Sequence, residues 1–206
     1  SGRKIMYVAT KKQAKEIVAN AANDVNMPYI TERWPGGMLT NFVTIRKAVK
    51  KMSAIDKMKS DGTFMVLSKR ERLQIDRQRA KLEKNLGSIS DMTRLPAALF
   101  VVDVMRESIA ILEAKKLGIP TFAIVDTNSD PELVDFPIPA NDDASKSITA
   151  IINVITASVK EGLSERKKEK EVQAAAKKDE AAKEEAKSDK IAEADKPKKE
   201  KKTKAE

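Results

Sequence analysis

The side chains best suited to chemistry are aspartates, two of which end apolar runs typical of buried strands. Asp103 and Asp126 each follow such a run, and further acidic residues come after them at Asp130, Asp142 and Asp143. If both runs are parallel strands, their carboxylates lie at the sheet edge where doubly wound folds bind ligands. Carboxylates are also ligands that Mg²⁺ prefers. One hypothesis is therefore a metal-dependent enzyme at this edge.

Other features of the sequence argue against an enzyme. Neither G-x-x-x-x-G-K-[ST] nor G-x-G-x-x-G occurs, so no phosphate-binding loop is recognisable. The chain contains no histidine and no cysteine, which removes the commonest general base, the commonest metal ligand and any disulfide. Turn formation at Asp130-Pro131 and helix capping at Asp142 explain the aspartates more simply. We predict no catalytic residue, no metal and no cofactor.

A second candidate site is the segment 33–41, Arg-Trp-Pro-Gly-Gly-Met-Leu-Thr-Asn. Arg33 suits bidentate contacts to phosphate, and Trp34, the only tryptophan, offers a face on which a base can stack. The paired glycines allow close approach of a sugar–phosphate chain, and amides at the start of the next helix favour anions. The alternative is that Trp34 packs in the core beneath a tight turn.

Positive charge is concentrated in one part of the chain. The formal net charge is +9, but residues 46–86 alone carry +8 and residues 87–163 carry −5. A local excess of this size indicates a surface that meets phosphate, although a merely solvated helical face is the alternative. No run approaches the roughly 20 apolar residues of a membrane helix, so no membrane partner is predicted.

Short apolar runs alternate with helical patterns. Helices are expected at 11–24, where Thr10 and Gln13 form a capping-box pattern, and around 109–114, with a last core helix that ends at Gly162. Strands are expected at 4–9, 28–30, 97–103, 121–126 and 135–139, the last at a sheet edge because it contains prolines. This alternation predicts an α/β fold with an open, mostly parallel sheet flanked by helices.

A long helical hairpin interrupts the alternation. Two patterns of about 20 residues, each with a narrow apolar seam, predict an antiparallel coiled-coil hairpin, and Ser68 with Glu71 forms a capping box for the second helix. The predicted divisions are 1–41 and 90–163 for the two parts of the α/β domain, 42–89 for the basic hairpin, and 164–206 for a charged tail, flexible or partly helical.

Several motifs resemble the bacterial family of protein two of the small ribosomal subunit. They are residues 33–41 with the hairpin after them, Leu95-Pro-Ala-Ala-Leu-Phe-Val-Val-Asp103, the run 118–131, and Phe136-Pro-Ile-Pro-Ala-Asn-Asp-Asp-Ala144. The resemblance covers residues 3 to about 162. It implies a flavodoxin-like sheet, and a cytoplasmic, structural role in translation with no small-molecule substrate. It also implies binding to small-subunit ribosomal RNA, docking of protein one of that subunit, and absence of the family's first segment.

These inferences define candidate site residues. The RNA-binding candidates are Lys11, Lys12, Arg33, Trp34, Gly36, Gly37, Thr40, Asn41, Arg46, Lys47, Lys50, Lys51, Lys57, Lys59, Lys69, Arg70 and Arg77. The candidates for contact with a protein partner are Asp126, Asp130, Asp142 and Asp143. Besides the metal-dependent enzyme, the remaining alternative is a free RNA- or DNA-binding regulator that uses the same hairpin.

Overall fold

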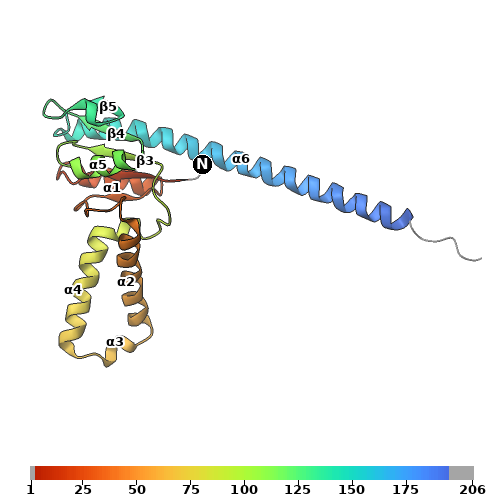
Figure 1. The fold of residues 1–206 in the computed structure, drawn as a ribbon, viewed down its shortest axis with the longest axis horizontal. Coiled ribbons are helices and arrows are strands. Elements are labelled where there is room, and N and C mark those ends of the chain that lie inside the picture. The colour runs from red at the N-terminus through yellow and green to blue at the C-terminus, as the bar shows by residue number, and fades with distance from the viewer. Residues whose placement is uncertain (1–2, 195–206) are drawn as a thin grey trace, which may run out of the picture. The chain divides into compact units, whose positions relative to one another are not determined.

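The computed structural model describes the backbone of residues 3–194 and the side chains of residues 3–169. The chain divides into two compact units, Ser1–Ala157 and Ser158–Glu206. The first unit holds the sheet and the hairpin (Figure 1). Within the described residues, no helix combines the length and the apolar character that crossing a membrane requires.

The sheet of the first unit has five strands, all of them parallel. The strands are β1 (Ile5–Val8), β2 (Tyr29–Ile30), β3 (Ala98–Val102), β4 (Thr121–Val125) and β5 (Phe136–Pro139). Their spatial order is β2-β1-β3-β4-β5, which is the flavodoxin-like order. The predicted fold class is therefore confirmed, and the proline-containing β5 lies at an edge as expected.

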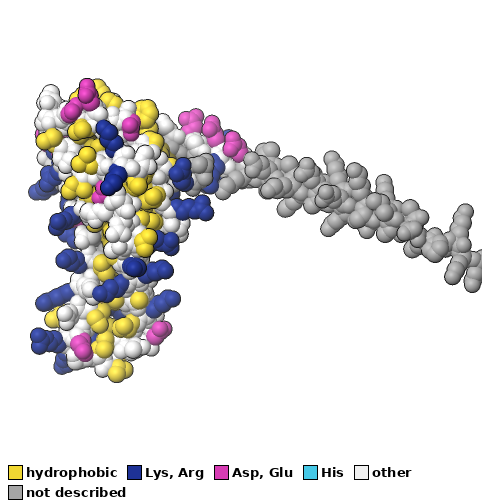
Figure 2. Space-filling view, viewed as in Figure 1, with side chains coloured by type: hydrophobic (Ala, Val, Ile, Leu, Met, Phe, Trp, Pro, Cys, Tyr) yellow, Lys and Arg dark blue, Asp and Glu magenta, His cyan; other side chains and the backbone are white. Residues whose placement is uncertain are grey.

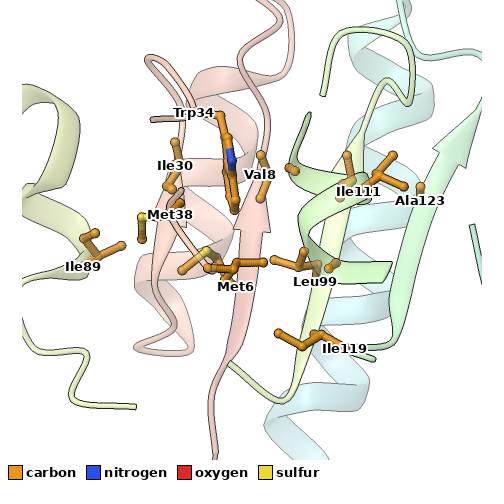
Figure 3. Close-up of a cluster of buried hydrophobic side chains, with 14 of the residues drawn as sticks. Met6, Val8, Ile30, Trp34, Met38, Ile89, Leu99, Ile111, Ile119 and Ala123 are labelled. Carbon is orange, nitrogen blue, oxygen red and sulfur yellow. The ribbon is translucent and has the colours of Figure 1, made fainter. Parts of the chain in front are cut away.

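Helices cover both faces of the sheet because alternate strand residues point to opposite sides. Tyr7 and Phe100 face α1 (Lys15–Asp24) and the start of α6 (Ser145–Ala194). Met6, Leu99 and neighbouring strand residues face α5 (Ser108–Lys116) and the base of the hairpin, where Trp34 and Ile89 join the same cluster (Figure 3). Two short 3₁₀ turns, η1 (Gly87–Ile89) and η2 (Pro131–Leu133), lie in the connections.

The hairpin, residues 42–86, extends from this second face (Figure 1). It consists of α2 (Phe42–Ser60), the single turn α3 (Thr63–Val66) and α4 (Lys69–Leu86). The predicted capping box is confirmed, because the Ser68 hydroxyl accepts from the Glu71 amide and the Glu71 carboxylate accepts from the Ser68 amide. Phe42, Ile45, Leu82 and Leu86 join the base of the hairpin to the core.

Two predicted helix boundaries are wrong. The first helix begins at Lys15 with no side-chain cap, and the Thr10 amide instead donates to Oε1 of Glu107 at 2.9 Å. Residues 11–14 form a turn, in which the amides of Ala14 and Lys15 donate to the Lys11 carbonyl oxygen. The helix α6 continues through Gly162, where a helix end was expected. The predicted tail reaches beyond residue 194 and so lies partly outside the described residues.

Candidate nucleic-acid interface

One buried carboxylate organises the segment 33–41, which links β2 to the hairpin. Oε1 of Glu113, on α5, accepts from the Trp34 indole nitrogen at 3.2 Å and from the Gly37 amide at 2.7 Å. Oε2 accepts from the amides of Leu39 and Thr40 at 2.9 and 3.2 Å, and from the Thr40 hydroxyl at 3.3 Å. Burial acts to raise the pKa of Glu113, but these donors outweigh it and lower that pKa below its ordinary value.

This arrangement corrects two expectations for the segment. The amides of Gly37, Leu39 and Thr40 are bonded to Glu113, so they are not available to bind a phosphate. Trp34 is only 7% exposed and lies beside Ile30 and Val8 (Figure 3), so its ring belongs to the core and offers no face for stacking. The alternative of a core tryptophan under a tight turn is the one that the structure supports.

The remaining residues of the segment have separate roles. Gly37 has φ +81°, a conformation that side chains disfavour, and an added Cβ would come within 3.2 Å of Cβ of Asn41. Gly36 has open space around it. Asn41 accepts a hydrogen bond from the Thr44 hydroxyl at 2.9 Å. Arg33, Gly36, Thr40 and Asn41 are exposed, and Arg33 is the charged residue among them, so it is the best placed to meet a phosphate.

Lys11 is not an RNA-binding candidate in this structure. It follows β1, and its ammonium group lies 2.6 Å from Oδ1 of Asp142, 2.5 Å from Oδ1 of Asp143 and 3.6 Å from Oδ2 of Asp103. Burial acts to lower the pKa of Lys11, but its bonds to Asp142 and Asp143 raise that pKa overall. The crevice between β1 and β3, where flavodoxin-like sheets bind ligands, is therefore filled by ion pairs. Lys12 is exposed beside it.

The aspartates that suggested a metal site have hydrogen-bond or ion-pair partners within the chain. Asp126 accepts from the amides of Thr127 at 2.7 Å and Asp142 at 3.3 Å, and these bonds lower its pKa. Asp130 caps η2 by accepting from the Glu132 amide at 2.9 Å. Across residues 3–169, no group of three or more acidic side chains is placed to hold a metal ion. Turn formation and capping account for Asp126 and Asp130, whereas Asp103, Asp142 and Asp143 are engaged by Lys11.

The predicted partner residues differ in accessibility. Asp130 and Asp143 are exposed and Asp126 is partly so. Asp142 is 1% exposed, and burial raises its pKa despite its bond to Lys11. Asp142 therefore cannot contact a partner. The expected cap of α6 is supplied by Asn141, whose side-chain oxygen accepts from the amides of Asp143 and Ala144 at 2.8 and 2.9 Å.

Most predicted cations of the hairpin are exposed. Lys59 is ion-paired to Asp76 at 2.5 Å, so it is a weaker candidate than the others. Arg79 is likewise paired to Asp56 and Glu83. Arg46 is exposed and donates to the carbonyl oxygen of Thr93 at 3.3 Å. In the described part of the chain, no ion pair is formed by Lys47, Lys50, Lys51, Lys57, Lys69, Arg70, Arg77 and Lys81.

The cations form one basic stripe on each helix. At 3.6 residues per turn, each stripe covers less than half of its helix and points away from the apolar seam. The α2 stripe comprises Arg46, Lys47, Lys50, Lys51 and Lys57, and the α4 stripe comprises Lys69, Arg70, Arg77, Lys81 and Lys84. Lysine and arginine side chains accordingly line both edges of the hairpin (Figure 2). One straight duplex can contact only one stripe at a time.

The arrangement of sheet and hairpin agrees with the comparisons with known proteins. Residues 1–162 match the family model described as ribosomal protein S2. The chain belongs to the ribosomal protein S2 family. It is 75% identical over 175 residues to small ribosomal subunit protein uS2 of Flavobacterium johnsoniae, which covers 85% of this chain and 69% of that protein. It is 69% identical over 170 residues to uS2 of Phocaeicola vulgatus, and the match covers 82% of this chain and 61% of that protein.

Membership of the ribosomal protein S2 family decides the class of function. The relatives are named as components of the small ribosomal subunit, a cytoplasmic particle in bacteria, and the family is structural and not enzymatic. The enzyme hypothesis is therefore set aside. The chain spans 69% of the Flavobacterium johnsoniae protein and 64% of the Flavobacterium psychrophilum protein, to which it is 74% identical over 171 residues.

Sequence patterns alone missed Glu113, the residue that organises the S2-family segment 33–41. One signal was present: the helical spacing of Ala110, Ile111 and Ala114 places Glu113 next to the inward face of α5. A carboxylate in that position requires several donors. The sequence does not reveal that the donors come from a segment more than 70 positions earlier.

Proposed function

We propose that this chain binds small-subunit ribosomal RNA through its hairpin and helps to dock protein one of the same subunit. The observation that carries the proposal is the pair of basic stripes, in which nine of the ten exposed cations form no ion pair among the described residues. Exposed lysines and arginines without acidic partners are the groups that release counterions when they meet phosphate.

The binding mode is charge neutralisation combined with shape. The cations lie on rigid helices of 19 and 18 residues, so their spacing is set before RNA arrives. Arg33 and the base of the hairpin supply a second contact beside the α2 stripe. A surface of this kind recognises backbone geometry and does not discriminate base sequence. If about six phosphates are contacted, affinity falls by about 10³ between 50 and 200 mM salt.

The acidic part of the chain supports the protein-docking half of the proposal. Residues 87–163 carry a net charge of −5, which disfavours contact with phosphate. Asp130 and Asp143 are exposed there. A shallow, mostly apolar groove of about 510 Å³ begins next to Asp130 and is lined by Val125, Asp126, Thr127, Ser129, Pro131, Pro137, Pro139 and Ala140. An apolar groove flanked by carboxylates suits a basic, amphipathic segment of a neighbouring protein.

Gradient sedimentation of a cell lysate tests the RNA-binding half. We expect the chain to migrate with the small ribosomal subunit and to dissociate progressively as salt is raised. Migration as a free, light species at all salt concentrations would favour the free-regulator alternative. Binding to purified small-subunit ribosomal RNA that does not respond to salt would contradict charge neutralisation as the mechanism.

A double variant tests the docking half. Asp130→Asn and Asp143→Asn remove two exposed charges, but each asparagine keeps an oxygen that accepts the hydrogen bonds of the original carboxylate. We expect subunits that carry this variant to retain less protein one in a pelleting assay, with affinity for RNA unchanged. Full retention of protein one would contradict the proposed role of this surface.

A further inference from the structure

At the base of the hairpin lies a small, partly enclosed pocket that the proposed function does not use. It has a volume of about 170 Å³ and is formed between α2 and the segment 89–93 that follows α4. Its lining residues are Phe42, Ile45, Arg46, Val49, Lys50, Ser53, Ile89, Ser90, Met92 and Thr93. The volume corresponds to about five or six water molecules, or to one heteroaromatic ring.

The lining has two chemically different parts. The floor is apolar, with buried Ile45, Ile89 and Met92 and the partly buried ring of Phe42. The rim carries hydroxyl groups of Ser53, Ser90 and Thr93 together with two exposed cations, Arg46 and Lys50. An apolar floor favours a planar ring. The Ser53 and Ser90 hydroxyls donate to Val49 and Asp91, and their oxygens are able to accept hydrogen bonds from the edge of the ring.

The cations at the rim belong to the α2 stripe. Arg46 donates a hydrogen bond to the carbonyl oxygen of Thr93, which lines the pocket from the segment 89–93. Lys50, one turn further along α2, has no ion pair among the described residues. A nucleotide whose base entered the pocket would place its phosphate at these two side chains. The positive charge of the rim thus favours a nucleic-acid backbone, and the apolar floor favours a nucleobase.

We propose that this pocket receives a single unstacked nucleobase of the RNA that the hairpin binds. The proposal rests on the proposed RNA-binding function and adds a defined subsite to it. The base is extruded from a bulge or loop, stacks on the apolar floor beside Phe42, and anchors the register of the α2 stripe along the RNA backbone. The pocket recognises that a base is extruded and does not discriminate which base it is. The proposal therefore agrees with RNA recognition by shape.

Filling the pocket provides the test. In Ser53→Phe a ring introduced from α2 occupies the volume, and in Ser90→Phe a ring enters from the opposite wall, so one variant remains if the other fails to fold. Asn20→Phe, at an exposed position of α1 remote from the pocket, is the matched control. Stacking of one base on an apolar surface contributes to RNA affinity. We therefore expect either pocket variant to bind small-subunit ribosomal RNA about tenfold more weakly, and the control to bind it unchanged.

Photo-crosslinking locates the base. The full chain is irradiated with transcripts of small-subunit ribosomal RNA that contain 4-thiouridine or 6-thioguanosine, and crosslinked tryptic peptides are identified by mass spectrometry. We expect base crosslinks on peptide 85–94, which contains Ser90, Met92 and Thr93. Filling the pocket should abolish them and leave other hairpin crosslinks in place.

The outcomes distinguish a failure of RNA binding from a failure of the pocket alone. If the unmodified chain fails to bind ribosomal RNA, the proposed function fails and the pocket proposal fails with it. If the chain binds but peptide 85–94 carries no crosslink with either transcript, the pocket proposal alone is overturned. It is also overturned if both pocket variants bind RNA as tightly as the unmodified chain. That result is expected if a side chain of a neighbouring protein, and not a nucleobase, occupies the pocket.

Discussion

The indole nitrogen of Trp34 donates a hydrogen bond to Oε1 of Glu113 across 79 positions of the chain, at 3.2 Å. Both side chains are buried, and the same carboxylate also binds amides of the segment 33–41. The bond joins the segment that leads into the hairpin to α5. It therefore assigns the only tryptophan to the scaffold and not to the RNA surface.

Trp34→Phe tests that assignment. Loss of the bond to a charged acceptor should lower the free energy of unfolding by about 2 kcal/mol, measured by urea denaturation. Affinity for ribosomal RNA, measured well below the unfolding transition, should stay within about twofold. A loss of about tenfold or more in affinity, with the free energy of unfolding unchanged, would instead indicate that the ring stacks on a base.

Glu113→Gln should make the protein less stable and less sensitive to acid. The pKa of Glu113 is below its ordinary value of 4.5, so its stabilising effect is present above that pH and is lost as the pH falls through the folded-state pKa. Replacing one acceptor oxygen by an amide should lower the free energy of unfolding by about 3 kcal/mol at pH 7. Urea denaturation between pH 3 and 7 should show a shallower acid slope in the variant, and equal slopes would contradict this account.

Gly37→Ala should be destabilising and Gly36→Ala should not. Alanine at Gly37 must adopt φ +81° and approaches Cβ of Asn41 at 3.2 Å, whereas Gly36 has open space. We expect a loss of about 1–2 kcal/mol in the free energy of unfolding for the first variant, measured by thermal denaturation. The second variant is the matched control and should change by less than about 0.5 kcal/mol. Similar losses in the two would mean that backbone conformation is not the cause.

The triple variant Lys47→Gln, Lys50→Gln and Lys51→Gln should flatten the salt dependence of RNA binding. Three adjacent cations of the α2 stripe are lost, so the slope of log affinity against log salt should fall by about 2 to 3. Lys115→Gln, Lys116→Gln and Lys146→Gln remove the same charge from exposed positions in the acidic part of the chain. That control should leave the slope unchanged in filter binding, and equal effects of the two sets would contradict a localised interface.

Lys11→Met should destabilise the sheet domain without a direct effect on RNA contacts. It removes the cation from Asp142, which is 1% exposed, and leaves a buried carboxylate without its partner. We expect a loss of about 3–5 kcal/mol in the free energy of unfolding at pH 7. The penalty should shrink as the pH falls through the pKa of Asp142, because a protonated carboxyl needs no cation. A penalty that is independent of pH would contradict this explanation.

Local sequence patterns predicted most elements of the fold. Apolar runs with strand-forming residues identified the largely buried strands β1, β3 and β4, since a strand buried on both faces is apolar throughout. The edge strand β5 is mostly exposed, and its prolines indicated its place. The capping box of Ser68 and Glu71 was predicted correctly because both partners lie within one turn of helix. The pattern at Thr10 and Gln13 failed because a contact distant in sequence, from Glu107, takes the Thr10 amide instead. A local capping pattern predicts the helix start correctly where no group distant in sequence binds the same backbone amide.

The sequence by itself determined the alternation of strands and helices, the length of the hairpin and the concentration of positive charge on it. These properties depend on residue type and spacing along the chain. Only the tertiary structure decided that Lys11 and Asp142 are buried as an ion pair, and that Trp34 and the Gly37 amide bind Glu113. The physical reason is that burial and pairing depend on neighbours brought together by folding, and the sequence order does not specify them.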